Sequence, residues 1–232
     1  MKEIKYIYFF NLLNIIIELN KFVYKLIYQN VKKSRKKALS DTRTRKLIYK
    51  TLKNKYKPPV SSSDKPDEAY ADGVIAAKAV EMIDQLSKNN KSPFFLAVGF
   101  KKPHLPFSAP KKYWHLYNRE RMPLAEFRQR AKNTSRLAYH NSGEMRSFAA
   151  PGWEYKSDKN NQLLIDKDSQ KKLIHGYYAC VTFIDFQIGK ILKKLRAKGL
   201  MSNTIIVIWG DHGYHLGDHL MWNKHSNFEQ AT

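Results

Sequence analysis

TIIVIWGDHG, residues 204–213, is the stretch that decides the fold class. Its first six residues form a short apolar run, rich in β-branched side chains, which is typical of a strand buried on both faces of a parallel sheet. Asp211 and His212 follow at once, between two glycines that allow a sharp turn. Open α/β sheets bind their ligands at the carboxyl ends of strands. The stretch therefore predicts an α/β protein with a candidate site just after this strand.

The sequence before this strand alternates helical and strand patterns. Apolar residues step by three and four from Tyr177 to Leu195, and Lys198-Gly199 supplies a helix end. Further back, residues 68–88 show the same spacing, and the apolar run Phe94–Phe100 predicts a second buried strand. Such alternation is typical of a sheet flanked by crossover helices.

Chemically capable residues follow both predicted strands. Asp211 and His212 supply adjacent oxygen and nitrogen donors for a metal, although they would equally serve as caps of a following helix. In the loop after the predicted strand 94–100, Lys102 and His104 flank Pro103, whose fixed φ stiffens the backbone. His104 is either a proton donor or a solvent-facing side chain. Lys224 suits a phosphate or sulfate oxygen, or is an ordinary surface lysine.

The amino-terminal part differs from the rest of the chain. The protein has 232 residues with 42 Lys+Arg against 20 Asp+Glu, and residues 1–57 hold 16 of these bases with 3 acids. The apolar stretch from Tyr6 to Ile17 is too short to span a bilayer and predicts an apolar-basic helix or a degenerate targeting signal. Residues 31–57 form a charge run, either solvated or a nucleic-acid patch. We interpret 1–57 as a basic leader, 58–63 as a linker, and 64–232 as the folded domain.

Three blocks of sequence carry a resemblance to a known family. They are SPFFLAVGFKKPHLPFSAPKKYW from Ser92, HGYYACVTFIDFQIGKIL from His175, and TIIVIWGDHGYHLGDHLMWNKHSNFEQAT from Thr204. In order and spacing the blocks resemble the sulfatase family of the alkaline-phosphatase-like superfamily, and most closely its iduronate-2-sulfatase branch, from about residue 64 to residue 232. The resemblance implies an α/β fold: a partial alkaline-phosphatase-like sheet flanked by helices, with a basic N-terminal extension.

The resemblance also implies roles for the candidate residues. Asp211 and His212 correspond to calcium-site residues. His104 and Lys224 would face the sulfate ester, His104 as the proton donor to the leaving oxygen and Lys224 as the cation for sulfate oxygens, with Lys102 as a less certain substrate-binding neighbour. The family's nucleophile is a formylglycine made from the Cys of a C-x-P-S-R motif, which this sequence lacks. Cys180 falls inside the predicted helix 177–195, and we interpret it as a core residue.

The leading hypothesis is a sulfuric ester hydrolase that acts on sulfated sugars of the glycosaminoglycan kind. We expect this chain to be a fragment that is inactive alone, because the nucleophile and part of the calcium site are missing. Lysosomal or secreted localisation follows from the resemblance. The alternative is a non-catalytic relative that binds sulfated polysaccharide. A phosphoesterase of the same superfamily, and a nucleic-acid-binding protein resting on residues 31–57, are minor alternatives. We expect a sulfated carbohydrate as partner, with no nucleic acid and no stable membrane span.

Overall fold

The computed structural model describes residues 5–11, 57–88, 92–148 and 150–232. The chain forms two compact units, each built from several segments. The described parts of the first unit are residues 5–11, 65–88, 92–102 and 181–211, and those of the second are 57–64, 103–148, 150–180 and 212–232. The long helix α6 (Lys167–Ala197) contributes its C-terminal part to the first unit and its N-terminal part to the second.

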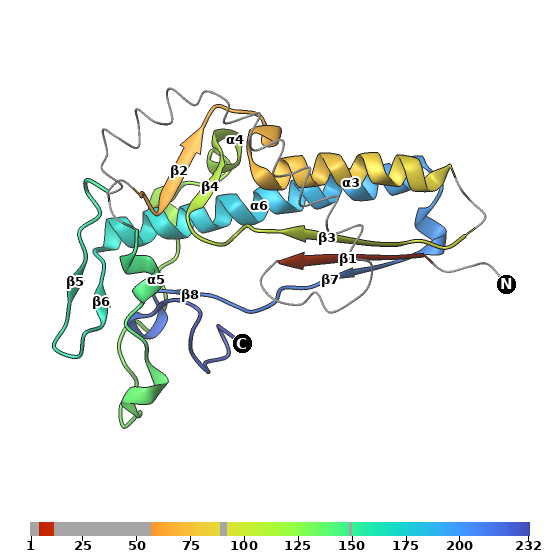
Figure 1. Ribbon diagram of the computed structural model, residues 1–232. Coiled ribbons are helices and arrows are strands. Elements are labelled where there is room, and N and C mark those ends of the chain that lie inside the picture. Colours follow the sequence, from red (N-terminus) through yellow and green to blue (C-terminus); the bar gives the residue numbers. More distant parts are fainter. Residues whose placement is uncertain (1–4, 12–56, 89–91, 149) are drawn as a thin grey trace. The chain divides into compact units, whose positions relative to one another are not determined.

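A three-stranded parallel sheet forms the centre of the first unit (Figure 1). Its order is β3 (Phe95–Phe100), β1 (Lys5–Asn11) and β7 (Thr204–Ile208), with β1 paired to both neighbours. Both strands predicted from their apolar runs are confirmed. Because the strands are parallel, the loops that follow β3 and β7 leave the same edge of the sheet.

Strand β1 corrects one prediction. It overlaps the apolar stretch 6–17, for which we expected a helix, and six residues of that stretch lie in the strand instead. The physical reason is pairing: residues 6–11 of β1 pair with β3 on one side, and residues 5–9 pair with β7 on the other. Such long-range partners override local helix propensity.

The core of the first unit lies between the sheet and two helices, α3 (Ala71–Ser87) and α6, which cover the same face (Figure 1). Ile83 and Leu96 are fully buried there. Expecting both strands to be buried on two faces was wrong. The other face carries exposed apolar side chains, with Phe95 50% exposed and Ile205 44% exposed, because the described helices cover one side only.

Helix α3 confirms the helix expected at 68–88, and its start is fixed by close packing. A Cβ on Gly73 would lie 2.0 Å from the carbonyl oxygen of Asp67, so only glycine fits at this position. Asp67 is itself buried, and it accepts hydrogen bonds from Lys190 Nζ at 2.8 Å and Gln187 Nε2 at 3.1 Å. These bonds connect the start of α3 to α6.

Helix α6 begins ten residues before the apolar steps that predicted it. Asp166 caps the helix: its Oδ1 accepts the backbone N–H of Ser169 at 2.9 Å, and this bond lowers the pKa of Asp166. The first turns are polar, so apolar periodicity did not reveal them. The other end is as expected, since the helix stops at Ala197 and Gly199 has a φ of +65°.

The second unit is built from short elements. Two parallel strands, β2 (Val60–Ser63) and β4 (Phe107–Pro110), lie beside α4 (Lys111–Trp114). Gly176 of α6 packs closely here, because a Cβ would meet the Trp114 ring at 2.8 Å. The remaining elements are α5 (Gly143–Arg146), β5 (Lys156–Ser157), β6 (Leu163–Leu164), β8 (His215–Leu216) and β9 (Trp222–Asn223).

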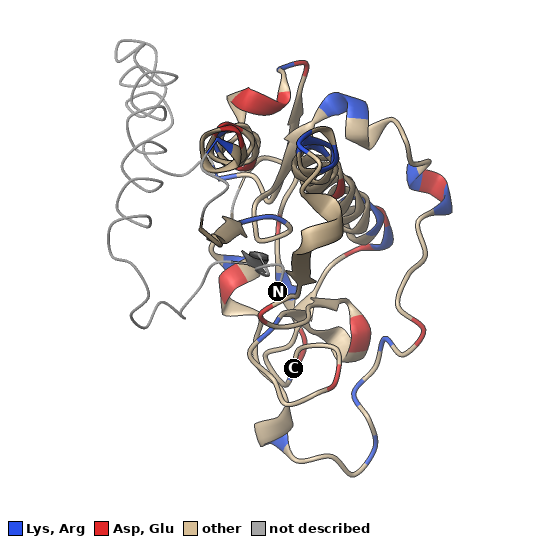
Figure 2. Cartoon of the chain, turned by 90° about the vertical axis from the view of Figure 1, so that its right-hand side faces the viewer, with Lys and Arg blue, Asp and Glu red and all other residues tan. Residues whose placement is uncertain are grey.

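Charged residues of both signs are interspersed over the described elements (Figure 2). The charge run 31–57, on which a nucleic-acid interpretation rests, lies outside the described residues. No helix in the described part of the chain is both long and apolar enough to cross a membrane. The interpretation of 1–57 as a leader and 58–63 as a linker stays a prediction.

Candidate functional site

His104 forms the starting point of the candidate site. The residue follows β3 in the loop that precedes β4, and its ring is half-buried. Nδ1 lies 2.8 Å from the carbonyl oxygen of Leu105, and Nε2 lies 3.1 Å from Oε1 of Glu144 in α5. Both ring nitrogens therefore face oxygens, and both contacts are hydrogen bonds when the ring is protonated. Glu144 thus orients His104.

Tyr214, which is half-buried, and Asn223, which is fully buried, extend this pair. Burial, with the charge of Glu144 as a further cause, raises the pKa of Tyr214 well above its usual value, so its hydroxyl stays neutral. Asn223 Nδ2 donates to that hydroxyl at 2.7 Å. The other carboxylate oxygen of Glu144, Oε2, is buried without a hydrogen-bond partner among the described residues. Glu144 therefore lies in a polar cluster that holds an unused acceptor.

Lys224 directly follows Asn223 and is half-buried. Its segment is tied to α5 by two buried bonds: Met145 N donates to Asn223 Oδ1 at 3.1 Å, and Trp222 N donates to Ser142 Oγ at 3.0 Å. His104, Glu144 and the residue before Lys224 therefore belong to one connected network. That His104 and Lys224 serve one site stays a prediction, as do their roles.

A second hydrogen-bond network, centred on His215, holds the segment that runs from His212 to Lys224. His215 is fully buried; its Nδ1 bonds to Asp218 Oδ2 and its Nε2 lies 2.6 Å from Ser226 Oγ. Burial acts to raise the pKa of Asp218, but the hydrogen bond and charge of His215 outweigh it, so this pKa is lowered. The order Ser-His-Asp matches a hydrolase triad. Since the imidazole is shielded from solvent, we interpret the network as a structural tie that holds the Lys224 segment.

His140 lies against this network. Its ring centroid is 6.2 Å from that of His215 and 6.1 Å from that of His225. Burial, together with the charges of these two histidines, lowers the pKa of His140 to about 4. Nδ1 accepts the backbone N–H of Ser142 at 3.0 Å, which requires an unprotonated nitrogen. His140 is therefore neutral at pH 7.

Lys102 belongs to the first unit, whereas the residues of the His104 network belong to the second. Its backbone N–H donates to Asp72 Oδ2 at 3.2 Å, and that of Lys101 donates to Asp72 Oδ1 at 2.7 Å. Asp72 is buried in the first turn of α3, and burial raises its pKa even though these bonds and charges act to lower it. Asp72 thus anchors the backbone after β3, at the start of the loop that carries His104.

Of the expected metal residues, Asp211 belongs to the first unit and His212 to the second. Asp211 is exposed, whereas His212 is half-buried with Nδ1 2.8 Å from the carbonyl oxygen of Gly213. Calcium takes six to eight oxygen ligands. Across residues 57–88, 92–148 and 150–232, no group of three or more His, Cys, Asp or Glu is placed to hold a metal ion. The described residues do not form a calcium cage, and of the two expected ligands Asp211 has the oxygen chemistry that calcium prefers.

Sequence reasoning missed several residues of these networks. Glu144, Asn223 and Asp72 come from short or helical segments, and each has a partner more than 28 positions away along the chain. No local pattern marks such a contact. Cys180, by contrast, is fully buried, as its place in the predicted helix indicated.

Comparison with known proteins agrees with these observations. The model of the sulfatase family matches residues 20–232. The chain belongs to the sulfatase family. The match begins inside the basic amino-terminal segment. Among curated sulfatases, the iduronate 2-sulfatase of Mus musculus is 34% identical over 182 residues, which cover 75% of this chain and 31% of that enzyme. The human iduronate 2-sulfatase gives the same values. The chain thus spans about a third of these relatives.

Solved structures agree on the fold. The phosphonate monoester hydrolase of Agrobacterium radiobacter superposes with a TM-score of 0.54 at 24% identity, covering 84% of this chain and 40% of that one. A structure determined with its substrate D-glucosamine-2-N,6-O-disulfate gives 0.52 at 18% identity, covering 70% and 41%. This sulfatase-family chain therefore has a mixed α/β fold of the kind found in these structures, and it covers part of each of them.

Proposed function

We propose that this sulfatase-family chain carries sulfate-facing loops of a sulfuric ester hydrolase of the iduronate-2-sulfatase type, acting on sulfated sugars in a lysosomal or secreted setting. The observation that carries the proposal is the 3.1 Å contact between His104 Nε2 and Glu144 Oε1, in a network that continues to the residue before Lys224. A sulfate ester bound between these side chains would meet one proton donor and one cation.

His104 would supply the proton of the reaction. Glu144 orients the protonated ring until an anionic sulfate oxygen competes for the Nε2 proton. As the sulfur–oxygen bond breaks, the bridging oxygen of the sugar takes that proton, and His104 becomes neutral. Because its pKa is raised, Tyr214 stays neutral, and the charged groups of the proposed site are His104, Glu144 and Lys224.

Lys224 would neutralise the sulfate. A half-buried ammonium is less screened than an exposed one and therefore favours sulfate oxygens more strongly. Lys102 is proposed as a further substrate neighbour. Asp211 and His212 are proposed as this chain's part of a calcium site, where the ion would stabilise negative charge. The attacking nucleophile is not among these residues, because the 232 residues hold no C-x-P-S-R motif.

The test uses the whole chain and measures binding and turnover together. Titration calorimetry with the methyl glycoside of iduronate 2-sulfate should show binding that weakens at least tenfold in His104→Ala and in Lys224→Ala. Lys198→Ala is the matched control, because Lys198 pairs with Asp84 in the first unit. Released sulfate is measured in the same samples, and we expect none above background.

Each outcome separates the hypotheses. Loss of binding in both variants, with no sulfate released, supports the proposed site and the expectation that the chain is inactive alone. Sulfate release that depends on His104 would support hydrolysis and overturn the expected inactivity. Binding unaffected by either substitution would overturn the proposed site.

A further inference from the structure

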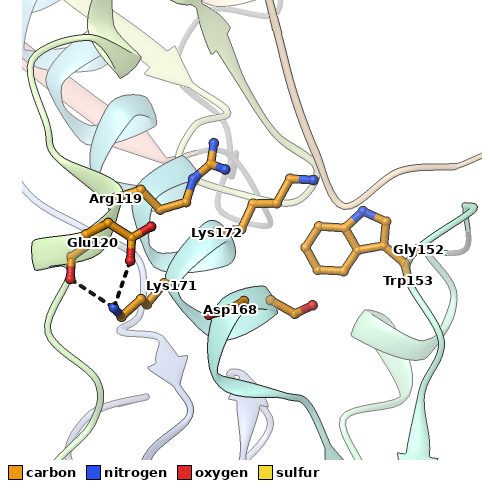
Figure 3. A pocket seen from close by; sticks show the side chains of 8 residues that line it. Arg119, Glu120, Gly152, Trp153, Asp168, Lys171 and Lys172 are labelled. Carbon is orange, nitrogen blue, oxygen red and sulfur yellow. Dashed lines mark hydrogen bonds and ion pairs between the residues drawn. The ribbon is translucent and has the colours of Figure 1, made fainter.

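A hollow of about 330 Å³ lies in the second unit and shares no residue with the His104 network (Figure 3). Three segments line it: the 3-10 turn Arg119–Arg121, the turn at Gly152 and Trp153, and the first turns of α6. Figure 3 shows these segments surrounding one space. The volume is at the small end of the range for ligand pockets, about 300 to 1,000 Å³, and suits one or two sugar rings.

The charges in this hollow are unequally paired. Lys171 Nζ bonds to Glu120 through its carbonyl oxygen at 2.9 Å and through Oε2 at 3.4 Å, so this cation is largely neutralised. Among the described residues, neither Arg119 nor Lys172 has a carboxylate within ion-pair distance. Lys172 Nζ instead lies over the Trp153 ring, 5.2 Å from its centroid, a contact that positions the ammonium without cancelling its charge. Two cations thus stay available to an anion.

The other lining groups favour a sugar over a bare ion. Asp168 offers carboxylate oxygens that accept hydroxyl hydrogen bonds, whereas they would repel an inorganic anion. Trp153 also lines the hollow, and although it is mostly buried, with 8% of its surface exposed, it offers an apolar edge beside a sugar ring. The amino end of α6 adds a positive partial charge, because peptide dipoles align along its 31 residues. Cations, an acceptor and an aromatic edge together match a polyhydroxylated anion.

We propose that this hollow binds an acidic sugar unit of the polysaccharide substrate, with Arg119 and Lys172 holding its carboxylate or sulfate and Asp168 accepting a hydroxyl. The inference rests on the proposed function for the choice of a sugar polymer. It adds a second binding site, formed by different residues, that would give a chain of several sugars more affinity than a single sulfated unit.

The experiment measures binding of three probes to the full chain: a hyaluronan tetrasaccharide, which has carboxylates and no sulfate, the methyl glycoside of iduronate 2-sulfate, and sodium sulfate. The test variant, Arg119→Gln with Lys172→Met, removes both charges and keeps most of each side chain. Its control, Lys159→Met with Lys167→Met, removes two exposed charges that do not line the hollow. Thermal unfolding verifies that both variants are folded.

We expect the test variant to weaken hyaluronan binding at least tenfold, the control to change it less than twofold, and sodium sulfate to compete only weakly. Lys172→Arg, made alone, should keep most of the hyaluronan binding, since a guanidinium is also a cation and also stacks on tryptophan. Equal weakening in test and control variants would overturn the inference in favour of general electrostatic attraction. Failure of the proposed function would give a different result. His104→Ala and Lys224→Ala would then leave the binding of the methyl glycoside of iduronate 2-sulfate unchanged, while hyaluronan binding would still depend on Arg119 and Lys172.

Discussion

The two units position their functional residues by different means. The first unit packs a continuous apolar core between α3, α6 and the sheet, and a single buried carboxylate, Asp72, fixes the backbone after β3. The second unit has short elements, and buried side-chain hydrogen bonds around Asn223 and His215 connect them. Non-directional packing makes a stable frame, whereas directional bonds set the orientation of individual side chains. The comparison predicts different sensitivities to mutation.

The largest effect is expected in the first unit. Ile83→Ala should lower the free energy of unfolding by about 3 to 4 kcal/mol, because it removes buried methyl groups and leaves a cavity. Ile205→Ala removes the same atoms from a side chain that is 44% exposed and should cost less than about 1 kcal/mol. Urea denaturation followed by circular dichroism measures both. Equal losses would show that the sheet's second face is as well packed as the first.

In the second unit, His215→Ala should cost about 2 to 3 kcal/mol, since Asp218 and Ser226 lose their common partner in a buried place. His225→Ala is the matched control, because His225 is exposed. Hydrogen exchange should report faster opening of residues 215–226 in the His215 variant, with the first unit unchanged. If exchange rises throughout both units, the network is not a local tie.

A pH effect should distinguish the units further. The folded pKa of His140, about 4, lies below its usual value of 6.5, so the unfolded chain binds more protons between these values. Stability is therefore full above about pH 6.5 and is lost as the pH falls toward 4. Because the ring is half-buried, we expect a loss of about 1 to 2 kcal/mol from this residue. His140→Gln should flatten this part of the stability–pH curve, and an unchanged slope would refute the assignment.

The smallest effect is expected at the surface of the first unit. Lys78 Nζ and Glu81 Oε1 are 2.5 Å apart at the i, i+3 spacing on α3, and Glu81 is largely exposed. Such pairs contribute about 0.3 kcal/mol. Glu81→Gln should therefore shift the urea midpoint barely beyond error. A loss above about 1 kcal/mol would mean that surface charge, rather than the apolar core, stabilises this helix.

Prediction from sequence succeeded where the signal is local and periodic. The helix at 68–88 and the strands at 94–100 and 204–209 follow from spacing and apolar runs, and the structure has them within a few residues. It failed where partners are distant. The strand character of β1 depends on β3 and β7, and one-sided burial of the sheet depends on where the helices pack.

The sequence by itself determined the α/β class, the sulfatase family and the identity of His104, Lys224 and Asp211 as candidate residues, because motifs and periodicity are properties of neighbouring positions. Only the tertiary structure decided that Glu144 orients His104, that Asp72 holds the loop after β3, and that Arg119 and Lys172 line one hollow. These pairings join residues far apart in the chain. Which distant side chains meet is settled by packing, and no short stretch of sequence encodes it.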